Sequence, residues 1–320
     1  MTQKFWVGYT SNNMKAILFS FAFATLLCFA SNAQTYQEQF DTKMDNNDTV
    51  GMYPLIIDWR KNEPNNPETE VAIFNYFAMR AFTEIVTLNS TPPEDGGESL
   101  EMVDSLGNVT GYLYGTPTVN DSLIQLSVKC INQGIAKYPN RLDLRLGKIY
   151  VLRESQHWDW MEEEIVSTLK QGQANKNSWY WMKNEPVEDD LNFLNSSLQE
   201  HFYVLFESGL PYGYEIIERC SKIMLEQDDA NVITLSNVAT CKMMKEEYAE
   251  ALTYINKAYS INANDEIIIN NAGFCHWKLG HPEDAKRYYV KALEMAKDNV
   301  GAIEYYQGQI DIMNKAIENR

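Results

Sequence analysis

A repeat with a constant period is the feature of this sequence that most limits its fold. The segment YAEALTYINKAYSINAND, residues 248–265, aligns with PEDAKRYYVKALEMAKDN, residues 282–299. This alignment places Ala251 on Ala285 and Ala258 on Ala292, so both pairs have the same separation along the chain. A fixed period of about 34 residues is typical of stacked helical hairpins, in which each unit buries its apolar side against the next.

The best repeat resembles the tetratricopeptide repeat, a helix–turn–helix unit of about 34 residues. Gly273 supplies the small residue of the first helix, and Ala285, Tyr289 and Ala292 supply the pattern of the second helix. Pro282 departs from the family pattern, where an aromatic residue is usual. The resemblance implies an all-α fold, an α-solenoid of tetratricopeptide-type helix hairpins in a right-handed superhelix, here with one inserted β-hairpin.

The repeat register divides the chain into segments. Residues 34–66 are polar and rich in Pro and Asn, and we expect an extended N-terminal segment. The other expected segments are degenerate repeats at 67–170, which begin with a helix at 71–88 and are interrupted by a β-hairpin at 89–119, an insertion at 171–195, tetratricopeptide repeats at 196–298 and a capping helix at 299–320. The hairpin is predicted because strand-like residues flank Leu106-Gly107-Asn108.

The N-terminal residues 1–33 have the pattern of a signal peptide. An apolar run at 16–30 follows Lys15, and small residues lead to a predicted cleavage site after Ala33. Residues 1–13 are predicted to lie upstream of the true start. Lipidation is disfavoured, because bulky Leu27 precedes Cys28. We therefore expect export, with a periplasmic or secreted mature chain and no membrane span.

Charge and motifs argue against two broad classes of function. The chain has 27 Lys and Arg against 44 Asp and Glu, for a net charge of −17, which disfavours nucleic-acid binding. The sequence lacks the GxSxG, Walker phosphate-loop and HExxH patterns. The acidic cluster at 157–164 fans around its helix and does not converge on one ion. We therefore predict no enzyme activity, no cofactor and no metal.

The first helices of such repeats line a concave groove, and the resemblance assigns the inward positions. A protein or peptide of unknown identity is the partner that it implies, with packing against neighbouring elements as the alternative role. The groove candidates are Phe202, Phe206, Ile233, Thr240, Met243, Met244, Ile267, Asn270, Phe274, Trp277 and Lys278.

Clustered tryptophans offer an alternative function. Exposed indole rings stack on sugars, and Trp160, Trp179 and Trp181 lie in or beside the predicted insertion. The alternative hypothesis is therefore a glycan-associated accessory or binding protein of a carbohydrate-uptake system. It requires Trp179 and Trp181 to be exposed and coplanar.

Overall fold

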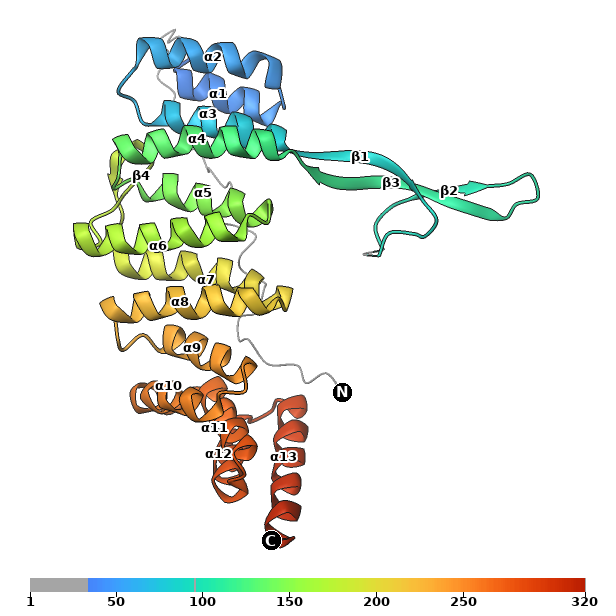
Figure 1. The fold of residues 1–320 in the computed structure, drawn as a ribbon, viewed down its shortest axis with the longest axis vertical. Helices are drawn as coiled ribbons and strands as arrows, with labels where there is room; N and C mark the ends of the chain where they lie inside the picture. Colours follow the sequence, from blue (N-terminus) through green and yellow to red (C-terminus); the bar gives the residue numbers. More distant parts are fainter. Residues whose placement is uncertain (1–33, 95, 320) are drawn as a thin grey trace. The chain divides into compact units, whose positions relative to one another are not determined.

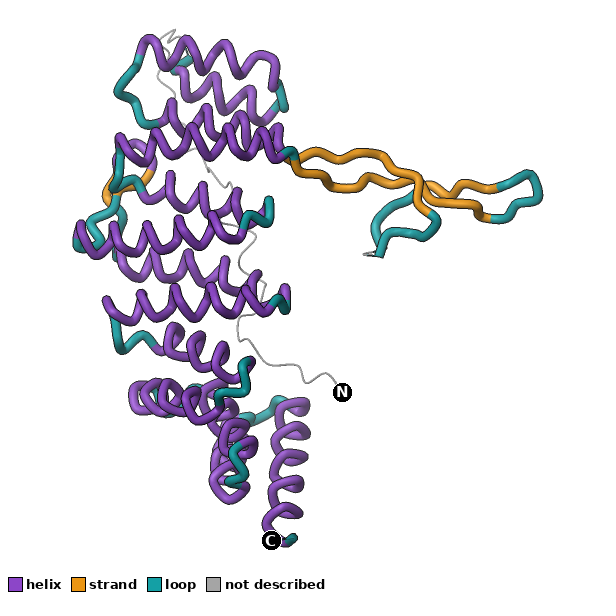
Figure 2. The backbone as a smooth tube through the Cα atoms, in the orientation of Figure 1, coloured by secondary structure: helices purple, strands orange, loops and turns teal. Residues whose placement is uncertain are grey.

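The computed structural model describes residues 34–94 and 96–319, and these fall into two compact units that divide at Leu194. Helices paired with their neighbours along the chain make up most of each unit (Figures 1 and 2). The predicted signal peptide and its cleavage site lie outside the described residues. Among the helices described, none has the length and apolar content needed to cross a membrane.

In its described residues, the unit that precedes Leu194 holds six α-helices, one short 3-10 helix and two small sheets. In chain order its elements are α1 (Tyr36–Asp45), α2 (Thr49–Asn62), α3 (Glu68–Ala81), β1 (Phe82–Asn89), β2 (Leu100–Val103), β3 (Val109–Val119), α4 (Asp121–Lys137), α5 (Leu142–Glu154), α6 (Trp158–Asn175), β4 (Tyr180–Trp181), the short 3-10 helix η1 (Met182–Asn184) and β5 (Glu185–Pro186).

The unit that follows is built from helices within its described residues. They are α7 (Asp190–Ser208, whose first turn belongs to the preceding unit), α8 (Pro211–Gln227), α9 (Val232–Met244), α10 (Tyr248–Ile261), α11 (Glu266–Lys278), α12 (Pro282–Met295) and α13 (Val300–Glu318). The predicted fold class, an all-α solenoid of helix hairpins with a β insertion, is confirmed.

The period of the sequence appears as repeated helix starts. Asn231, Asp265 and Asn299 are the N-caps of α9, α11 and α13, and each side chain accepts a hydrogen bond from a backbone N–H in the first turn. The turns inside the pairs repeat as well, because Glu246 and Gly280 both have positive φ. By this register α13 is the first helix of a further repeat, and it occupies the segment predicted as a cap.

Residues 34–66 differ from the prediction of extended chain, since they form α1 and α2. Thr35 and Glu38 make a reciprocal capping box that starts α1. Met52, Ile56 and Trp59 share one face of α2 and are buried with Phe40. This burial against α3 stabilises a helix that Pro54 and the many Asn residues concealed in the sequence.

The β insertion is longer than predicted and has three strands. The helix expected at 71–88 ends at Ala81, and β1 takes up Phe82–Asn89. The strand order is β1-β3-β2, with β1 antiparallel to β3 from Phe82↔Val119 to Asn89↔Tyr112. The predicted turn between β2 and β3 is present, and Asp104 Oδ1 accepts hydrogen bonds from the backbone N–H groups of Leu106 and Asn108.

The insertion predicted at 171–195 is shorter, because α6 continues to Asn175 and α7 begins at Asp190. Lys176 and Asn177, both with positive φ, end α6. The strands β4 and β5 pair within the remaining loop.

Close contact between paired helices depends on small residues. A Cβ atom added to Gly273 of α11 would lie 3.1 Å from the ring of Tyr289, which is fully buried on α12. In the preceding repeat the same two positions hold Ala239 and Ile255. The first-helix residue there is larger than Gly273, and the second-helix residue is smaller than Tyr289. Gly273 therefore makes room for Tyr289.

We predict that Gly273→Leu lowers the free energy of unfolding by about 1–3 kcal/mol, because the new side chain overpacks the buried Tyr289 ring. Gly308→Ala in α13 is the matched control. Nothing lies within 4 Å of its added Cβ, so better helix propensity should raise stability by about 0.5–1 kcal/mol. Urea denaturation followed by circular dichroism measures both. Unchanged stability in Gly273→Leu would contradict the packing argument.

Candidate functional site

The predicted groove residues divide by their exposure. Three are buried, five are half-buried and three are exposed. The buried residues are Phe202, Met243 and Phe274; the half-buried ones are Phe206, Thr240, Ile267, Asn270 and Trp277; the exposed ones are Ile233, Met244 and Lys278. The position of each residue in the repeat predicts the side of the helix on which it lies, but not how deeply its side chain is buried.

Phe274 belongs to the core that joins α9, α10 and α11. Its ring meets the ring of Tyr248 edge-on, with 5.9 Å between centroids. Lys278 covers this pair, with Nζ 5.5 Å from the centre of Phe274 and 5.7 Å from that of Tyr248. Met243 lies in the same core. Packing, the alternative role, therefore accounts for Phe274 and Met243.

The remaining groove positions do not form a continuous apolar strip. Ile233 and Met244, 46% and 36% exposed, stand at opposite ends of α9, about 16 Å apart along its axis. Trp277 packs beside the core of α12 and α13. The Oδ1 atom of Asn270 is buried and has no hydrogen-bond partner, so it is available to accept one.

The tryptophans do not make a sugar-stacking platform. Trp179 is 1% exposed and lies with the Arg145 guanidinium 6.0 Å from its ring. Trp181 packs edge-on against Phe193, with 5.2 Å between centroids. The glycan hypothesis requires Trp179 to be exposed, and that requirement is wrong. The indole of Trp179 is buried between its loop and α6, where it lies beside Gly172.

Trp160 differs from the other two tryptophans because it is exposed. Its ring stacks on His157, 4.8 Å between centroids, beside a hollow of about 380 Å³. Lys129, Lys148 and Glu163 also line this hollow, whose walls come from α4, α5 and α6. One tryptophan with mixed charges around it is a weak basis for recognising a sugar.

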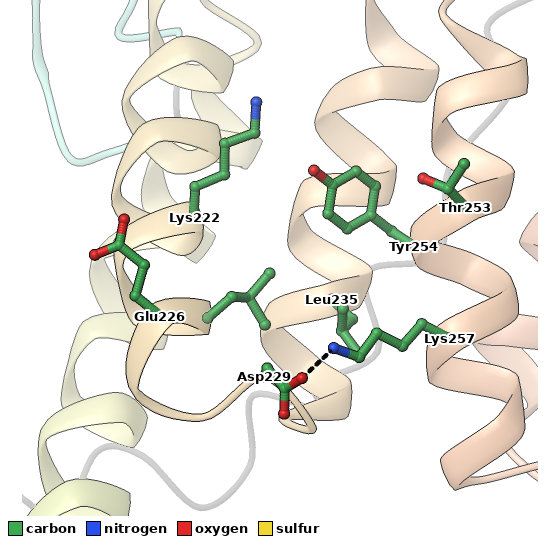
Figure 3. A pocket seen from close by; sticks show the side chains of 8 residues that line it. Lys222, Glu226, Asp229, Leu235, Thr253, Tyr254 and Lys257 are labelled. Atoms are coloured by element: carbon green, nitrogen blue, oxygen red, sulfur yellow. Dashed lines mark hydrogen bonds and ion pairs between the residues drawn. The ribbon is translucent and has the colours of Figure 1, made fainter.

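A second hollow of about 380 Å³ lies among α8, α9 and α10 (Figure 3). Leu225 and Leu235 contribute apolar surface, and Lys257 Nζ lies 2.7 Å from Asp229 Oδ2 at one side. Its lining comes mainly from the second helices of two successive pairs, which the repeat pattern did not single out. It brings together charges of both signs rather than a set of reactive groups.

Several exposed apolar side chains gather on one face of the β1–β3–β2 sheet. The register sets Leu88, Leu113 and Leu100 in one row across the three strands. Val86 and Met102 flank this row on the same face, opposite Gly115 and Gly111 respectively. Val86, Leu88, Leu100 and Met102 have between 43% and 75% of their surface exposed. We call these five apolar residues the sheet face.

The sheet extends away from the helices at the ends of α3 and α4 (Figure 1). Residues 82–119 contain acidic residues and no Lys or Arg. The acids are Glu84, Glu94, Asp95, Glu98, Glu101 and Asp104. Sequence reasoning missed this surface because it placed β1 in a helix. The alternation in TGYLYG was the available signal, but the row of leucines needs the strand register.

Residues 268–299 match the family model described as a tetratricopeptide repeat. The chain contains a tetratricopeptide repeat. The match covers most of α11, all of α12 and the cap of α13. A comparison with curated proteins gave no match.

Three solved structures illustrate what this chain is similar to. The C-terminal part of a TPR repeat-containing protein from Cytophaga hutchinsonii is 10% identical with a TM-score of 0.45, over 88% of this chain and 94% of that one. PilF of Pseudomonas aeruginosa is 10% identical with a TM-score of 0.35, over 86% and 96%. The first TPR domain of human RPAP3 is 21% identical with a TM-score of 0.34, over 38% and 91%.

We predict that Phe274→Ala lowers the free energy of unfolding by about 3–5 kcal/mol, because it leaves a cavity beneath Tyr248. Ile233→Ala is the matched control at an exposed groove position, and it should change stability by less than about 0.5 kcal/mol. Urea denaturation of both variants measures the difference. Equal, small effects would show that Phe274 is free to line the groove.

Proposed function

We propose that this chain is a non-catalytic scaffold that binds another protein, and that the sheet face makes the principal contact. The carrying observation is the row of Leu88, Leu113 and Leu100, which lies on a sheet face that none of the described helices covers. Exposed contiguous apolar surface is typical of interaction sites. The helical repeats position the sheet.

The sheet face offers more binding energy than the groove. Fully burying one leucine side chain is worth about 1.5–3 kcal/mol, so several adjacent leucines exceed what Ile233 and Met244 supply at separate ends of α9. Part of this gain is lost in ordering the two surfaces. The sheet residues are already fixed by strand pairing, and the hydroxyls of Thr87 and Thr116 lie 2.6 Å apart across β1 and β3.

Charge indicates the kind of partner. The inserted residues 82–119 carry acids and no base, so a second copy of the chain would bring like charges together. A protein with an apolar patch bordered by Lys and Arg would complement the sheet face. The acids would then raise the rate of association and make it depend on salt.

The proposed place of action is the cell envelope or the exterior of the cell. The support is the basic residue, apolar run and small-residue exit within 1–33. The proposed role is non-catalytic, in keeping with a sequence that lacks recognised nucleophile, phosphate-binding and metalloprotease patterns. The glycan alternative gains no support from the burial of Trp179.

We predict that Leu88→Ser combined with Leu100→Ser reduces partner capture at least tenfold, because it removes the two outer leucines of the row, on either side of Leu113, from the contact. The wild-type chain and its variants are immobilised and exposed to an extract of the source cells. Mass spectrometry quantifies each bound protein, and a salt wash tests the electrostatic contribution.

Two controls locate the contact. Ile85→Ser changes an exposed residue of the same strand on the opposite face, and Ile233→Ser with Met244→Ser changes the groove. Support requires a salt-sensitive protein that both controls retain and the sheet variant loses. A protein lost only from the groove variant would contradict the proposal. Self-association of the wild type, abolished by the sheet variant, would make a second copy the occupant.

We predict that the mature chain begins at Gln34, because the signal pattern ends at Ala33. Expression in the source cells, fractionation and N-terminal sequencing measure the start. An intact N-terminus on cytoplasmic protein would contradict export without affecting the assignment of the sheet face.

A further inference from the structure

The turn between α11 and α12 brings together three side chains that can ligate a metal ion. They are His276 near the end of α11, His281 just before α12, and Asp284 in the first turn of α12. One ligand atom from each lies within 4.8 Å of the other two. These residues do not follow the HExxH pattern of a single helix, because the chain reverses direction between the two histidines.

The backbone of the turn fixes this arrangement. Gly280 takes a positive φ of 77°, which a glycine adopts without strain. The N–H of His281 donates to the carbonyl of His276 over 2.9 Å, and the N–H of Gly280 donates to the carbonyl of Trp277 over 3.0 Å. The two histidines are therefore held at one end of the helix pair by the same hydrogen bonds that close the turn.

His276 presents an unsatisfied ligand atom. Its Nδ1 is buried and has no hydrogen-bond partner, and the nearest carboxylate oxygen, Asp284 Oδ2, lies 3.9 Å away. The ring stacks on Tyr288 with 5.4 Å between centroids and 16° between planes, which limits its rotation. A buried polar atom without a partner is costly, so a cation between the two groups would satisfy Nδ1 and pair with the half-exposed Asp284 carboxylate.

Asp284 is oriented toward this gap by a second contact. Its Oδ1 forms an ion pair with Arg287 Nη2 at 3.0 Å, which leaves Oδ2 facing His276. Outer partners of this kind commonly orient carboxylate ligands in metal sites. The positive charge of Arg287 opposes binding, but its side chain is largely exposed and screened by solvent.

We infer that His276, His281 and Asp284 form a binding site for a divalent transition-metal ion such as Zn²⁺. Two imidazoles and one carboxylate suit zinc, whereas calcium and magnesium require mainly oxygen ligands. Bonds of about 2.0–2.2 Å in a tetrahedral site place ligand atoms about 3.4 Å apart. The three atoms now lie within 4.8 Å of one another, so binding requires a rotation of the exposed His281 side chain and a small shift of Asp284 to reach that spacing.

The ion would join the end of α11 to the start of α12. With three protein ligands, a fourth position remains for water. An ion that binds the folded turn but not the unfolded chain would stabilise this helix pair by mass action. This inference is independent of the sheet face, which belongs to the other compact unit.

We predict that the tag-free full chain, stripped with a chelator, binds one Zn²⁺ per chain in competition with a chromophoric chelator. His281→Ala and Asp284→Asn should each weaken binding at least tenfold, because each removes a ligand from the site. Co²⁺ absorption then reports direct imidazole and carboxylate ligation. His276 is left unchanged in this test because its ring also packs on Tyr288.

Two matched controls test whether zinc binding depends on the three proposed ligands and not on other acids or histidines. Glu283→Gln removes the acid next to Asp284, and His157→Ala removes a histidine of the other unit. Both should bind as the wild type does. Wild-type affinity no tighter than millimolar, or undiminished binding in folded His281→Ala and Asp284→Asn, would overturn the site. Circular dichroism melts with and without Zn²⁺ verify folding and should show a rise in Tm that both ligand variants lose.

Discussion

The close crossing of paired helices is the constraint on which the repeat structure depends. Ala251 and Ala258 of α10, like Ala285 and Ala292 of α12, are completely buried where each second helix meets its neighbours. Small side chains at these positions let the helices approach, and the larger aromatic and aliphatic residues fill the space between them. Because the same crossing recurs, the helix caps return at a constant interval, and a change at Gly273 must be matched at Tyr289.

Ion pairs inside the helical units use many of the scarce basic residues. Burial alone would raise the pKa of Glu218, but hydrogen bonds from Lys222, Lys245 and Lys242 outweigh this effect and hold it at about 2. Arg145 and Lys148 similarly share the buried Glu164. Lys222 and Glu218 both belong to α8, whereas the pairs of Lys242 with Glu218 and of Arg145 and Lys148 with Glu164 join successive helices and draw these three bases toward the packed interior. The acidic excess of the composition is therefore concentrated in the remaining surface, of which the insertion at 82–119 is one part.

The repeats could be predicted because their determinants are local, whereas the other elements depend on distant partners. Alanine spacing and caps lie within one helix pair. The helix α2, by contrast, is stabilised by contacts of Trp59 with Phe40 and with residues of α3. The end of α3 at Ala81 has no Gly or Pro to mark it, and β1 forms because β3 pairs with it. The burial of Phe274 was equally hidden, since it depends on the ring of Tyr248 from another helix.

The two proposed binding surfaces occur at equivalent places in the repeat, the turn between the first and second helix of a pair. The sheet leaves α3 at Ala81 and returns to α4 at Asn120, and the N–H of Asn120 donates to the carbonyl of Ala81 over 2.8 Å. Since both ends meet, a long insertion is compatible with the packing of α3 on α4. The α11–α12 turn, by contrast, is short. Its proposed site depends on the side chains of His276, His281 and Asp284 and needs no inserted residues. Turns are thus the positions where this fold can acquire a function while the crossing of the helices remains intact.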